Sequence, residues 1–176
     1  MRLGQRLGPQ LLMAALCIAM AWSGPLLAEK ADRDKPTTID SDKLNHDDQK
    51  QITIFTGNVV LTKGTLVMRG DRMELAQDAA GNYFGTMTGR PARFRQKREG
   101  VNEFMEGEAL QLDYNGKDEV VILIQNAVMR RLEGDVLRDQ VAGNRLTYDN
   151  LTERYQVESN EGQPRSRMFL MPGKRP

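Results

Sequence analysis

Apolar and polar residues alternate one by one over short stretches of the chain beyond its amino-terminal segment. This alternation predicts β-strands with one buried and one solvated face, whereas no stretch keeps the apolar period of an amphipathic helix. Pairs of turn residues separate the stretches, and Asn115-Gly116 is the strongest pair, because both central residues of a type I′ turn need positive φ. The clearest alternating stretches are Leu66–Arg69, Arg72–Leu75, Ala92–Arg95 and Leu110–Tyr114. The pattern predicts an all-β protein.

A four-residue pattern recurs along the chain: a small residue, a polar residue, any residue, and then Leu or Met. It begins at Ser41, Gly70, Gly107 and Gly143. A second set of segments, interleaved with the first, begins at Gly57, Gly89, Gln125 and Gly162. Because small residues permit bulges and sharp bends in strands, we expect the chain to bend between sheets at these positions. Units this small cannot bury an apolar face alone, so the repeats favour a stacked solenoid or a layered jelly roll.

The amino terminus has the features of a secretory signal. Arg2 and Arg6 precede an unbroken apolar stretch, 11–22, and a small residue follows at Ala28. This combination predicts a cleaved signal peptide; the alternative is an uncleaved anchor, for which the stretch is short, since a membrane span needs about 20 residues. Cleavage would remove Cys17 and leave a mature chain without a disulfide. The predicted organisation is a signal peptide over 1–28, a flexible segment over 29–36, a single β-domain over 37–171 and a flexible tail over 172–176.

The charge balance narrows the classes of function. Lys and Arg number 25 and Asp and Glu number 24, which gives a formal net charge of +1. A dedicated nucleic-acid binder usually carries a strong basic excess, so no nucleic-acid partner is expected. One His and one Cys exclude the richer metal clusters and leave little for nucleophilic catalysis, so we expect no metal and no cofactor. The composition favours a binding protein over an enzyme.

His46 is the one histidine, and it stands beside Asp47 and Asp48. A metal site or a general base could be built from these three side chains. The same segment is typical of a polar turn between two strands, and we favour that interpretation. Paired carboxylates elsewhere could serve glycoside hydrolysis, and their spacing alone does not exclude it.

The densest group of basic residues is Arg90, Arg93, Arg95, Lys97 and Arg98. It could contact phosphorylated sugars or a nucleic-acid backbone. It could equally be the solvated face of a strand, where charge discourages edge-to-edge pairing, and we favour this second interpretation. Alternation places Arg93, Arg95 and Lys97 on the face opposite Phe94.

Several segments, in an ordered series, resemble the OstA-like family of lipopolysaccharide-export bridge proteins. The segments are Pro36–Leu44, Ile54–Thr65, Gly89–Phe94, Glu106–Ala109 with Tyr114, Val120–Leu123 and Gln125–Ala127. The family usually has Gly-Asn-Ala where this chain has Gln-Asn-Ala. The resemblance covers about Pro36 to Tyr148 and thins past Leu151.

The resemblance implies an open, V-shaped antiparallel β-jelly roll, or β-taco, with an apolar trough along its length. It also implies a periplasmic protein that binds the acyl chains of lipid A in that trough. Its expected partners are lipopolysaccharide, the related domains of inner-membrane and outer-membrane export proteins, and further copies of itself joined head to tail.

Two sets of residues are candidates for these contacts. The candidates for the trough lining are apolar or aromatic: Ile39, Ile52, Ile54, Leu66, Met68, Leu75, Phe94, Leu112, Tyr114, Ile122, Ile124 and Met129. The alternative for each is that it fills a closed core. The candidates for edge-strand contacts with partners lie near the two ends of the domain: Thr37, Thr38, Ile39, Asp40, Arg167, Met168 and Phe169.

A lipid conduit without catalytic activity is therefore the leading hypothesis. One alternative is a secreted β-solenoid enzyme that acts on polysaccharide, which would need a cleft with paired carboxylates. The other is an adaptor that pairs through edge strands and binds no lipid.

Overall fold

The computed structural model describes residue 32 and residues 35–160 and 162–172. The described residues form ten strands and one continuous sheet. The strands are β1 (Thr37–Asp40), β2 (Lys43–Asp47), β3 (Ile52–Lys63), β4 (Leu66–Gln77), β5 (Tyr83–Lys97), β6 (Glu103–Asn115), β7 (Val120–Glu133), β8 (Val136–Asp149), β9 (Arg154–Glu158) and β10 (Arg167–Leu170). No helix in this part of the chain is long and apolar enough to cross a membrane. The predicted signal peptide lies outside the described residues.

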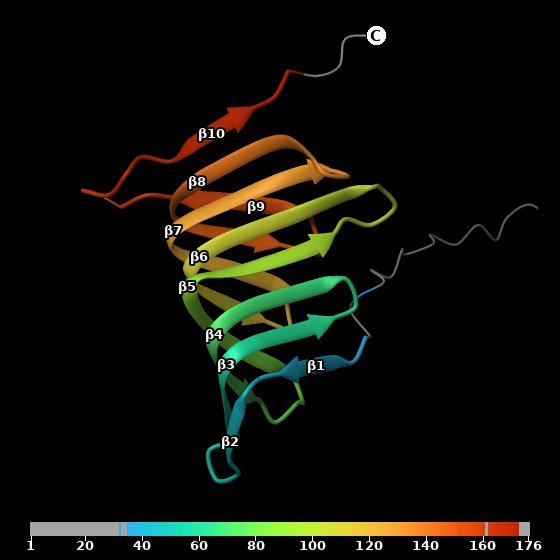
Figure 1. The fold of residues 1–176 in the computed structure, drawn as a ribbon, viewed down its shortest axis with the longest axis vertical. Coiled ribbons are helices and arrows are strands. Elements are labelled where there is room, and N and C mark those ends of the chain that lie inside the picture. The colour runs from blue at the N-terminus through green and yellow to red at the C-terminus, as the bar shows by residue number, and fades with distance from the viewer. Residues whose placement is uncertain (1–31, 33–34, 161, 173–176) are drawn as a thin grey trace, which may run out of the picture.

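The six long strands, β3 to β8, pair with their neighbours in chain order, and every pairing is antiparallel. Two short strands finish each end of this stack. At the first end β1 and β2 both pair with β3, and at the second end β9 and β10 both pair with β8 (Figure 1). The all-β prediction is confirmed, and so is the antiparallel sheet whose two ends are not joined to each other.

The register shifts near the middle of each strand pair from β3–β4 to β7–β8, and β7–β8 has a second shift near its end, between Arg131 and Leu132. In the first pair the shift falls between Thr56 and Val59, where Gly57 and Asn58 both have positive φ. In the last it falls between Ile124 and Ala127, around Gln125 and Asn126, again with positive φ. We call this row of bulges the fold line. The predicted bends are confirmed at Gly57, Gly70, Gly89, Gln125 and Gly143, which lie at or beside a bulge, because β-bulges bend and twist a sheet. Gly107 instead pairs regularly with Phe94 and Met129, and Gly162 lies outside the strands.

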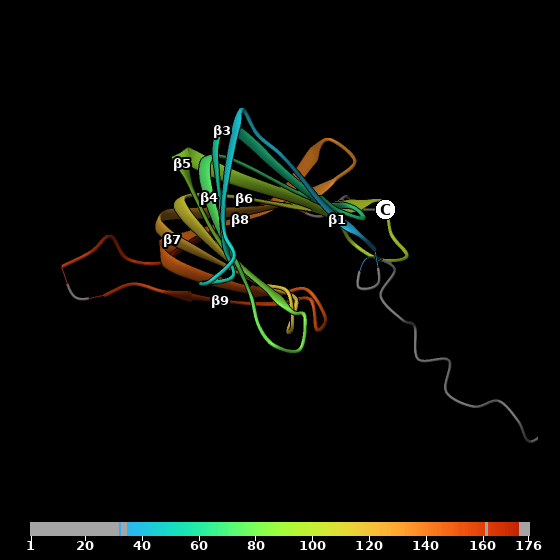
Figure 2. The same ribbon diagram turned by 90° about the horizontal axis from the view of Figure 1, so that it is seen from below.

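The fold line divides the sheet into two leaves, which Figure 2 shows as the two arms of a V. The β1 leaf contains β1, β10 and residues 59–63, 66–70, 92–97, 103–109, 127–133 and 136–143. The β2 leaf contains β2, β9 and residues 52–56, 72–77, 83–88, 111–115, 120–124 and 145–149. The buried apolar residues lie between the leaves and form one core cluster.

Gly107 shows why one strand of the β1 leaf needs a glycine. A Cβ atom at this position would lie 2.2 Å from Cε1 of Phe94 and 2.8 Å from Cδ2 of Leu123. The glycine therefore leaves the space into which the Phe94 ring packs, at a point where both leaves approach each other closely.

Candidate functional site

An apolar ladder crosses the inner face of the β1 leaf from one end of the sheet to the other. Each member is the direct cross-strand partner of the next. The members are Ile39, Leu61, Met68, Phe94, Gly107, Met129, Val141 and Met168. Its interior side chains are at most 4% exposed, whereas Met168, on the last strand, is 52% exposed. The ladder is buried along its length and open at its far end.

A second ladder crosses the inner face of the β2 leaf in the same way. Its members are Leu44, Phe55, Met73, Met87, Leu112, Leu123, Leu146 and Val157. Leu44, on the first strand, is 58% exposed, while the interior members are buried. The two ladders face each other, and we call the apolar space between the leaves the trough.

Eight of the twelve predicted lining residues lie on this inner face. They are Ile39, Leu66, Met68, Leu75, Phe94, Leu112, Tyr114 and Met129. All eight belong to the buried core cluster or pack against it. Their contact with lipid remains a prediction.

The other four predicted residues lie on the outer face, so their predicted facing is wrong. Ile54 lies directly across from Glu74, whose next partner is Thr86. Ile122 lies directly across from Asp113. Ile52 and Ile124, each two positions away on the same strands, share this outer face. Every residue from Val120 to Ile124 is apolar, so alternation could not tell the two faces of β7 apart. In β3 the inner face carries Thr53 and Phe55, and burial of the large Phe55 side chain decides which residues of this strand face inward.

The two leaves pack directly on each other. The rings of Phe94 on the β1 leaf and Tyr148 on the β2 leaf stack with centroids 6.1 Å apart and an interplanar angle of 18°. Burial, and then the negative charge of Glu153, raises the pKa of Tyr148 to about 12. The inner residues thus form a closed core in this state, and methionine is prominent among them. The buried methionines are Met68, Met73, Met87, Met105 and Met129.

Opposite the fold line, the tips of the two leaves meet, and we call this side the mouth of the trough. Lys63, at the end of β3 on the β1 leaf, pairs with Glu119, which precedes β7 on the β2 leaf. Both side chains are buried, and the Lys63 Nζ also donates to Tyr114 Oη at 3.3 Å. Burial opposes the charge of Lys63, but the hydrogen bond and the negative charge of Glu119 outweigh burial and raise its pKa above the ordinary 10.5. Burial and Glu119 also raise the pKa of Tyr114.

A second ion pair joins the leaves farther along the mouth. Arg98, just after β5, places Nη2 2.6 Å from Oε2 of Glu153, in the turn between β8 and β9. Its other terminal nitrogen contacts Glu103 on its own leaf. The hydrogen bond with Glu153 is the main reason that the pKa of Arg98 is raised.

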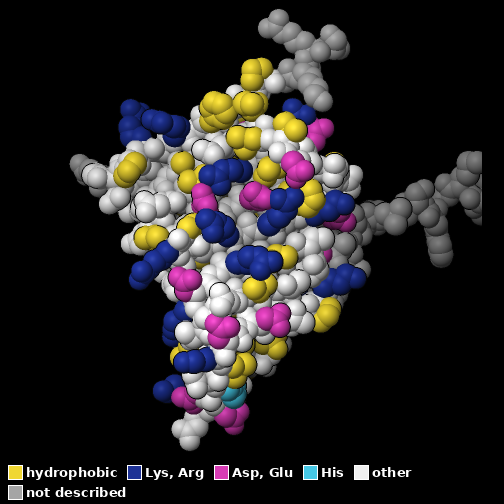
Figure 3. All heavy atoms as spheres, viewed as in Figure 1, with side chains coloured by type: hydrophobic (Ala, Val, Ile, Leu, Met, Phe, Trp, Pro, Cys, Tyr) yellow, Lys and Arg dark blue, Asp and Glu magenta, His cyan; other side chains and the backbone are white. Residues whose placement is uncertain are grey.

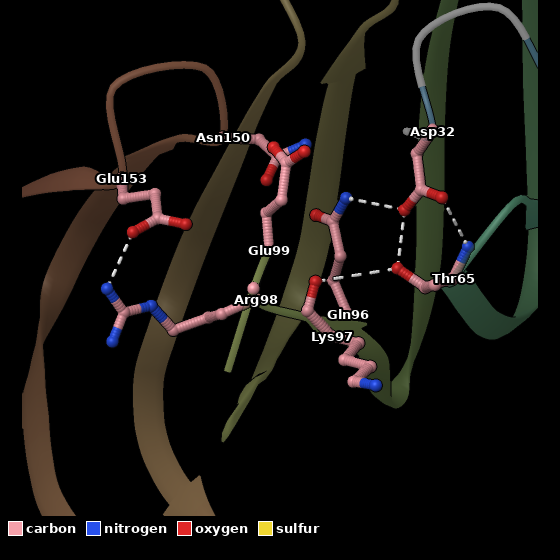
Figure 4. A pocket seen from close by; sticks show the side chains of 9 residues that line it. Asp32, Thr65, Gln96, Lys97, Arg98, Glu99, Asn150 and Glu153 are labelled. Atoms are coloured by element: carbon pink, nitrogen blue, oxygen red, sulfur yellow. Dashed lines mark hydrogen bonds and ion pairs between the residues drawn. The ribbon is translucent and has the colours of Figure 1, made fainter. Parts of the chain in front are cut away.

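A pocket of about 220 Å³ lies at the mouth. Its walls come from both leaves and from Asp32, and Figure 4 shows the side chains around it. The residues of this mouth pocket are Asp32, Thr65, Gln96, Lys97, Arg98, Glu99, Gly100, Asn150 and Glu153. Asp32 accepts hydrogen bonds from the Thr65 amide at 2.9 Å and from the Thr65 hydroxyl.

The predicted edge residues lie at the two ends of the strand order. Thr37, Thr38, Ile39 and Asp40 make up β1, and Arg167, Met168 and Phe169 lie in β10. Figure 3 shows apolar side chains gathered at the end that β10 forms. Four consecutive residues there are between 44% and 63% exposed: Met168, Phe169, Leu170 and Met171. Contact of these residues with partners remains a prediction.

Two of the four basic residues of β5 pair with acidic residues of β6. Arg93 Nε lies 3.3 Å from Glu108, and Arg95 pairs with Glu106 on the outer face, opposite Phe94. This cross-strand pairing supports a solvated strand face over an anion-binding patch, because the charges of Arg93 and Arg95 already have partners.

His46 lies in β2 and not in the turn that follows it, so the predicted position in a turn is wrong. Its backbone pairs with Thr53, and its Nδ1 lies 2.9 Å from Thr53 Oγ1. Among the residues that the structure describes, no group of three His, Cys, Asp or Glu side chains is arranged to hold a metal ion.

Comparison with known proteins places this geometry in a family. Residues 38–154 match the family described as "LptA/(LptD N-terminal domain) LPS transport protein". The chain is 29% identical over 145 residues to lipopolysaccharide export system protein LptA of Escherichia coli (strain K12), covering 81% of this chain and 75% of that protein. It is 28% identical over 173 residues to lipopolysaccharide export system protein LptH of Pseudomonas aeruginosa, covering 93% and 92%.

A solved structure agrees with these sequence matches. The crystal structure of LptH, the LptA-homologous periplasmic component of the lipopolysaccharide transport device of Pseudomonas aeruginosa, superposes with a TM-score of 0.73 at 26% identity. The match covers 80% of this chain and 99% of the other. The resemblance found in the sequence and the expected open β-fold are both confirmed. The expectation of a transport protein, and not an enzyme, is confirmed by the same matches. The chain belongs to the family of LptA and LptD N-terminal-domain lipopolysaccharide transport proteins.

Proposed function

We propose that this LptA-like protein carries lipopolysaccharide across the periplasm by enclosing its acyl chains in the trough between the two leaves. The observation that carries the proposal is the pair of apolar ladders, which run without a polar interruption from the strands of one sheet end to those of the other. An acyl chain lying along them would be surrounded by apolar side chains over its whole length.

The energetics of transfer explain why continuity matters. Burying an acyl chain of roughly a dozen carbons, at about 0.8 kcal/mol per methylene, stabilises it by on the order of 10 kcal/mol. Release of several such chains into water would be very slow. Passage from one trough into another replaces one apolar surface by a similar one, so the burial terms nearly cancel.

The closed core can accept a lipid because of what fills it. The five buried methionines are unbranched and flexible, and such side chains repack around ligands of different shape. An entering chain would take the place of contacts between the leaves, such as the stacking of Phe94 on Tyr148, while the ladders of each leaf stay intact.

We also propose that copies of the protein, and related domains of its membrane-bound partners, join end to end. β1 and β2 are bonded on one side to β3, and β9 and β10 to β8, so each end offers strand edges to another sheet. The exposed Leu44 at one end and Met168 at the other continue the two ladders to these edges. Docking of one end on the opposite end of a second copy would extend both sheet and trough, and such head-to-tail contact can be repeated to build a rod.

Photo-cross-linking at neighbouring positions tests lipid binding. Benzoylphenylalanine at Phe94 keeps an aromatic ring on the inner face, whereas the same residue at Arg95 lies on the outer face. We expect irradiation with purified lipopolysaccharide to give cross-links at position 94 and few at position 95. Equal labelling at both positions, with far-UV circular dichroism showing intact folds, would contradict a lipid-binding trough. Labelling at neither position would favour an adaptor that binds no lipid.

Light scattering tests end-to-end assembly. We expect the wild type to associate with increasing concentration. Ile39→Pro removes an amide donor from β1 and should shift the protein toward the monomer while cross-linking at position 94 persists. A wild type that stays monomeric at high concentration and does not bind membrane-anchored partner domains would rule out the bridge and leave a soluble carrier.

A further inference from the structure

One buried polar atom at the mouth has no hydrogen-bond partner among the described residues. Gln96 is 3% exposed, and its Oε1 accepts no hydrogen bond. Buried side-chain oxygens are nearly always paired, because an unpaired buried acceptor loses its hydrogen bonds to water and gains none in the protein. An unpaired acceptor that borders a pocket therefore points to a ligand with a donor group.

The neighbours of Gln96 fix which end of its amide faces the pocket. Nε2 lies 3.3 Å from Oδ2 of Asp32, and a carboxylate oxygen can only accept a hydrogen bond. The amide nitrogen must therefore face Asp32, which leaves the oxygen on the other side. Figure 4 shows this oxygen turned away from Asp32, toward the side of the pocket where Glu99 and Asn150 lie.

Gln96 also stands at a boundary of polarity along the inner face of β5. Ala92 and Phe94, deeper in the trough, are buried and apolar, and Arg98, beyond Gln96, is charged and paired across the mouth. The strand and the residue just beyond its end thus present an apolar, then an amide, then a charged side chain. This order matches a lipid whose acyl chain ends in a neutral polar linkage before its headgroup.

The charges around the pocket argue against an anionic group at this point. Three carboxylates border it, those of Asp32, Glu99 and Glu153, against two cationic side chains, those of Lys97 and Arg98. Figure 4 shows the Lys97 side chain turned away from Gln96. Arg98 is already engaged by Glu103 and Glu153. The carboxylates would repel a phosphate, and the Arg98 guanidinium, already paired, would offset this repulsion little. A neutral donor could instead hydrogen-bond to the unpaired Gln96 Oε1.

We propose that the mouth pocket is a subsite for a neutral hydrogen-bond donor of the bound lipid, a hydroxyl or an amide N–H close to the root of an acyl chain, and that Gln96 Oε1 accepts that hydrogen bond. The proposal rests on the proposed function, since it presupposes an acyl chain in the trough. It adds selectivity to a site whose apolar ladders would bind any chain alike.

Competition between matched fourteen-carbon amphiphiles tests the subsite, with displacement of a fluorescent fatty-acyl probe from the full mature chain as the measurement. The competitors are methyl tetradecanoate, which has no donor, N-methyl tetradecanamide, methyl 3-hydroxytetradecanoate and tetradecyl phosphate. We expect the wild type to bind the amide or the hydroxy ester about fivefold more tightly than the plain ester. Gln96→Met keeps the length of the side chain without the acceptor and should abolish this preference. Gln111→Met, on the outer face, should retain it.

The outcomes separate this proposal from the proposed function. If no competitor displaces the probe from the wild type, acyl-chain binding itself fails. If all four bind alike, or if Gln96→Met keeps the preference, the trough stands and the subsite is wrong. A preference for the phosphate that weakens with salt would show an anion site instead. Should Gln96→Met not fold, the side-chain amide resonance of Gln96 in the wild type gives the answer, since it should shift with the amide or the hydroxy ester and not with the plain ester.

Discussion

The fold line and the mouth close the same trough from opposite sides by different means. At the fold line the chain itself passes from one leaf to the other, and paired strands continue on both sides of each bulge. At the mouth the leaves meet through side chains, chiefly Lys63 with Glu119 and Arg98 with Glu153. The backbone hydrogen bond at the tips from Asn150 to Glu119 joins neighbouring turns of a single leaf. The trough can therefore widen at the mouth without breaking a sheet hydrogen bond.

The largest expected effect comes from breaking the buried pair at the mouth. Lys63→Met leaves the buried Glu119 without its cation, and this should lower the free energy of unfolding by about 3 kcal/mol. Lys63→Met combined with Glu119→Gln removes both charges and should recover most of that loss. Urea denaturation measures both variants. A double variant as unstable as the single one would mean that Lys63 acts through packing and not through charge.

The fall of stability at alkaline pH should show whether the two leaves stay packed around Tyr148, deeper in the trough than the mouth. Tyr148 has a pKa of about 12 in the folded protein, against 10.0 when exposed. Above pH 10 the unfolded chain loses this proton first, so stability should fall between pH 10 and 12, by roughly 2 to 3 kcal/mol in all. The part due to Tyr148 should be absent in Tyr148→Phe, as measured by urea denaturation at each pH. Ionisation of Tyr148 near pH 10 in the folded protein would show that the leaves separate freely.

The fold line should respond to backbone crowding with a loss of stability. A Cβ at Gly70 would lie 2.6 Å from Met87 Cγ and 2.7 Å from the carbonyl oxygen of Thr88. Gly70→Ala should therefore cost about 2 kcal/mol, whereas Arg69→Ala, at an exposed neighbouring position, should change little. Thermal unfolding compares the two variants. Lipid binding per folded molecule should be unchanged, and a specific loss of binding would mean that the fold line also moves during loading.

The smallest expected effect on stability is at the more exposed pair of the mouth, where the effect on lipid exchange should be clear. Arg98→Ala removes the link to Glu153 and should cost about 1 kcal/mol. It should speed dissociation of a fluorescent acyl probe severalfold, as measured by stopped flow. Arg93→Ala removes an ion pair of the outer face and serves as the control. Equal exchange rates in both variants would show that the mouth is not the route of entry.

Local sequence patterns predict the strands, the bends and most of the trough. The recurring segments mark the fold line because a bend is a local backbone requirement, met by positive φ at Gly57 and also at Gln125, where the residue is not small. The facing of Ile122 could not be predicted, since both faces of its strand are apolar. The partner of Lys63 could not be predicted either, because Glu119 reaches it only after the sheet has folded onto itself. The same holds for Gln96, whose unpaired oxygen is a property of the assembled mouth.

The uniform polarity along the two ladders has a consequence for the direction of transport. Leu, Met, Val, Ile and Phe follow one another from strand to strand with no steep change in polarity. A lipid sliding along joined troughs would thus move on a nearly flat free-energy profile, stepping forward and backward with similar probability. Net flux along such a path would have to come from its two ends, through loading of lipid at one end and its removal at the other.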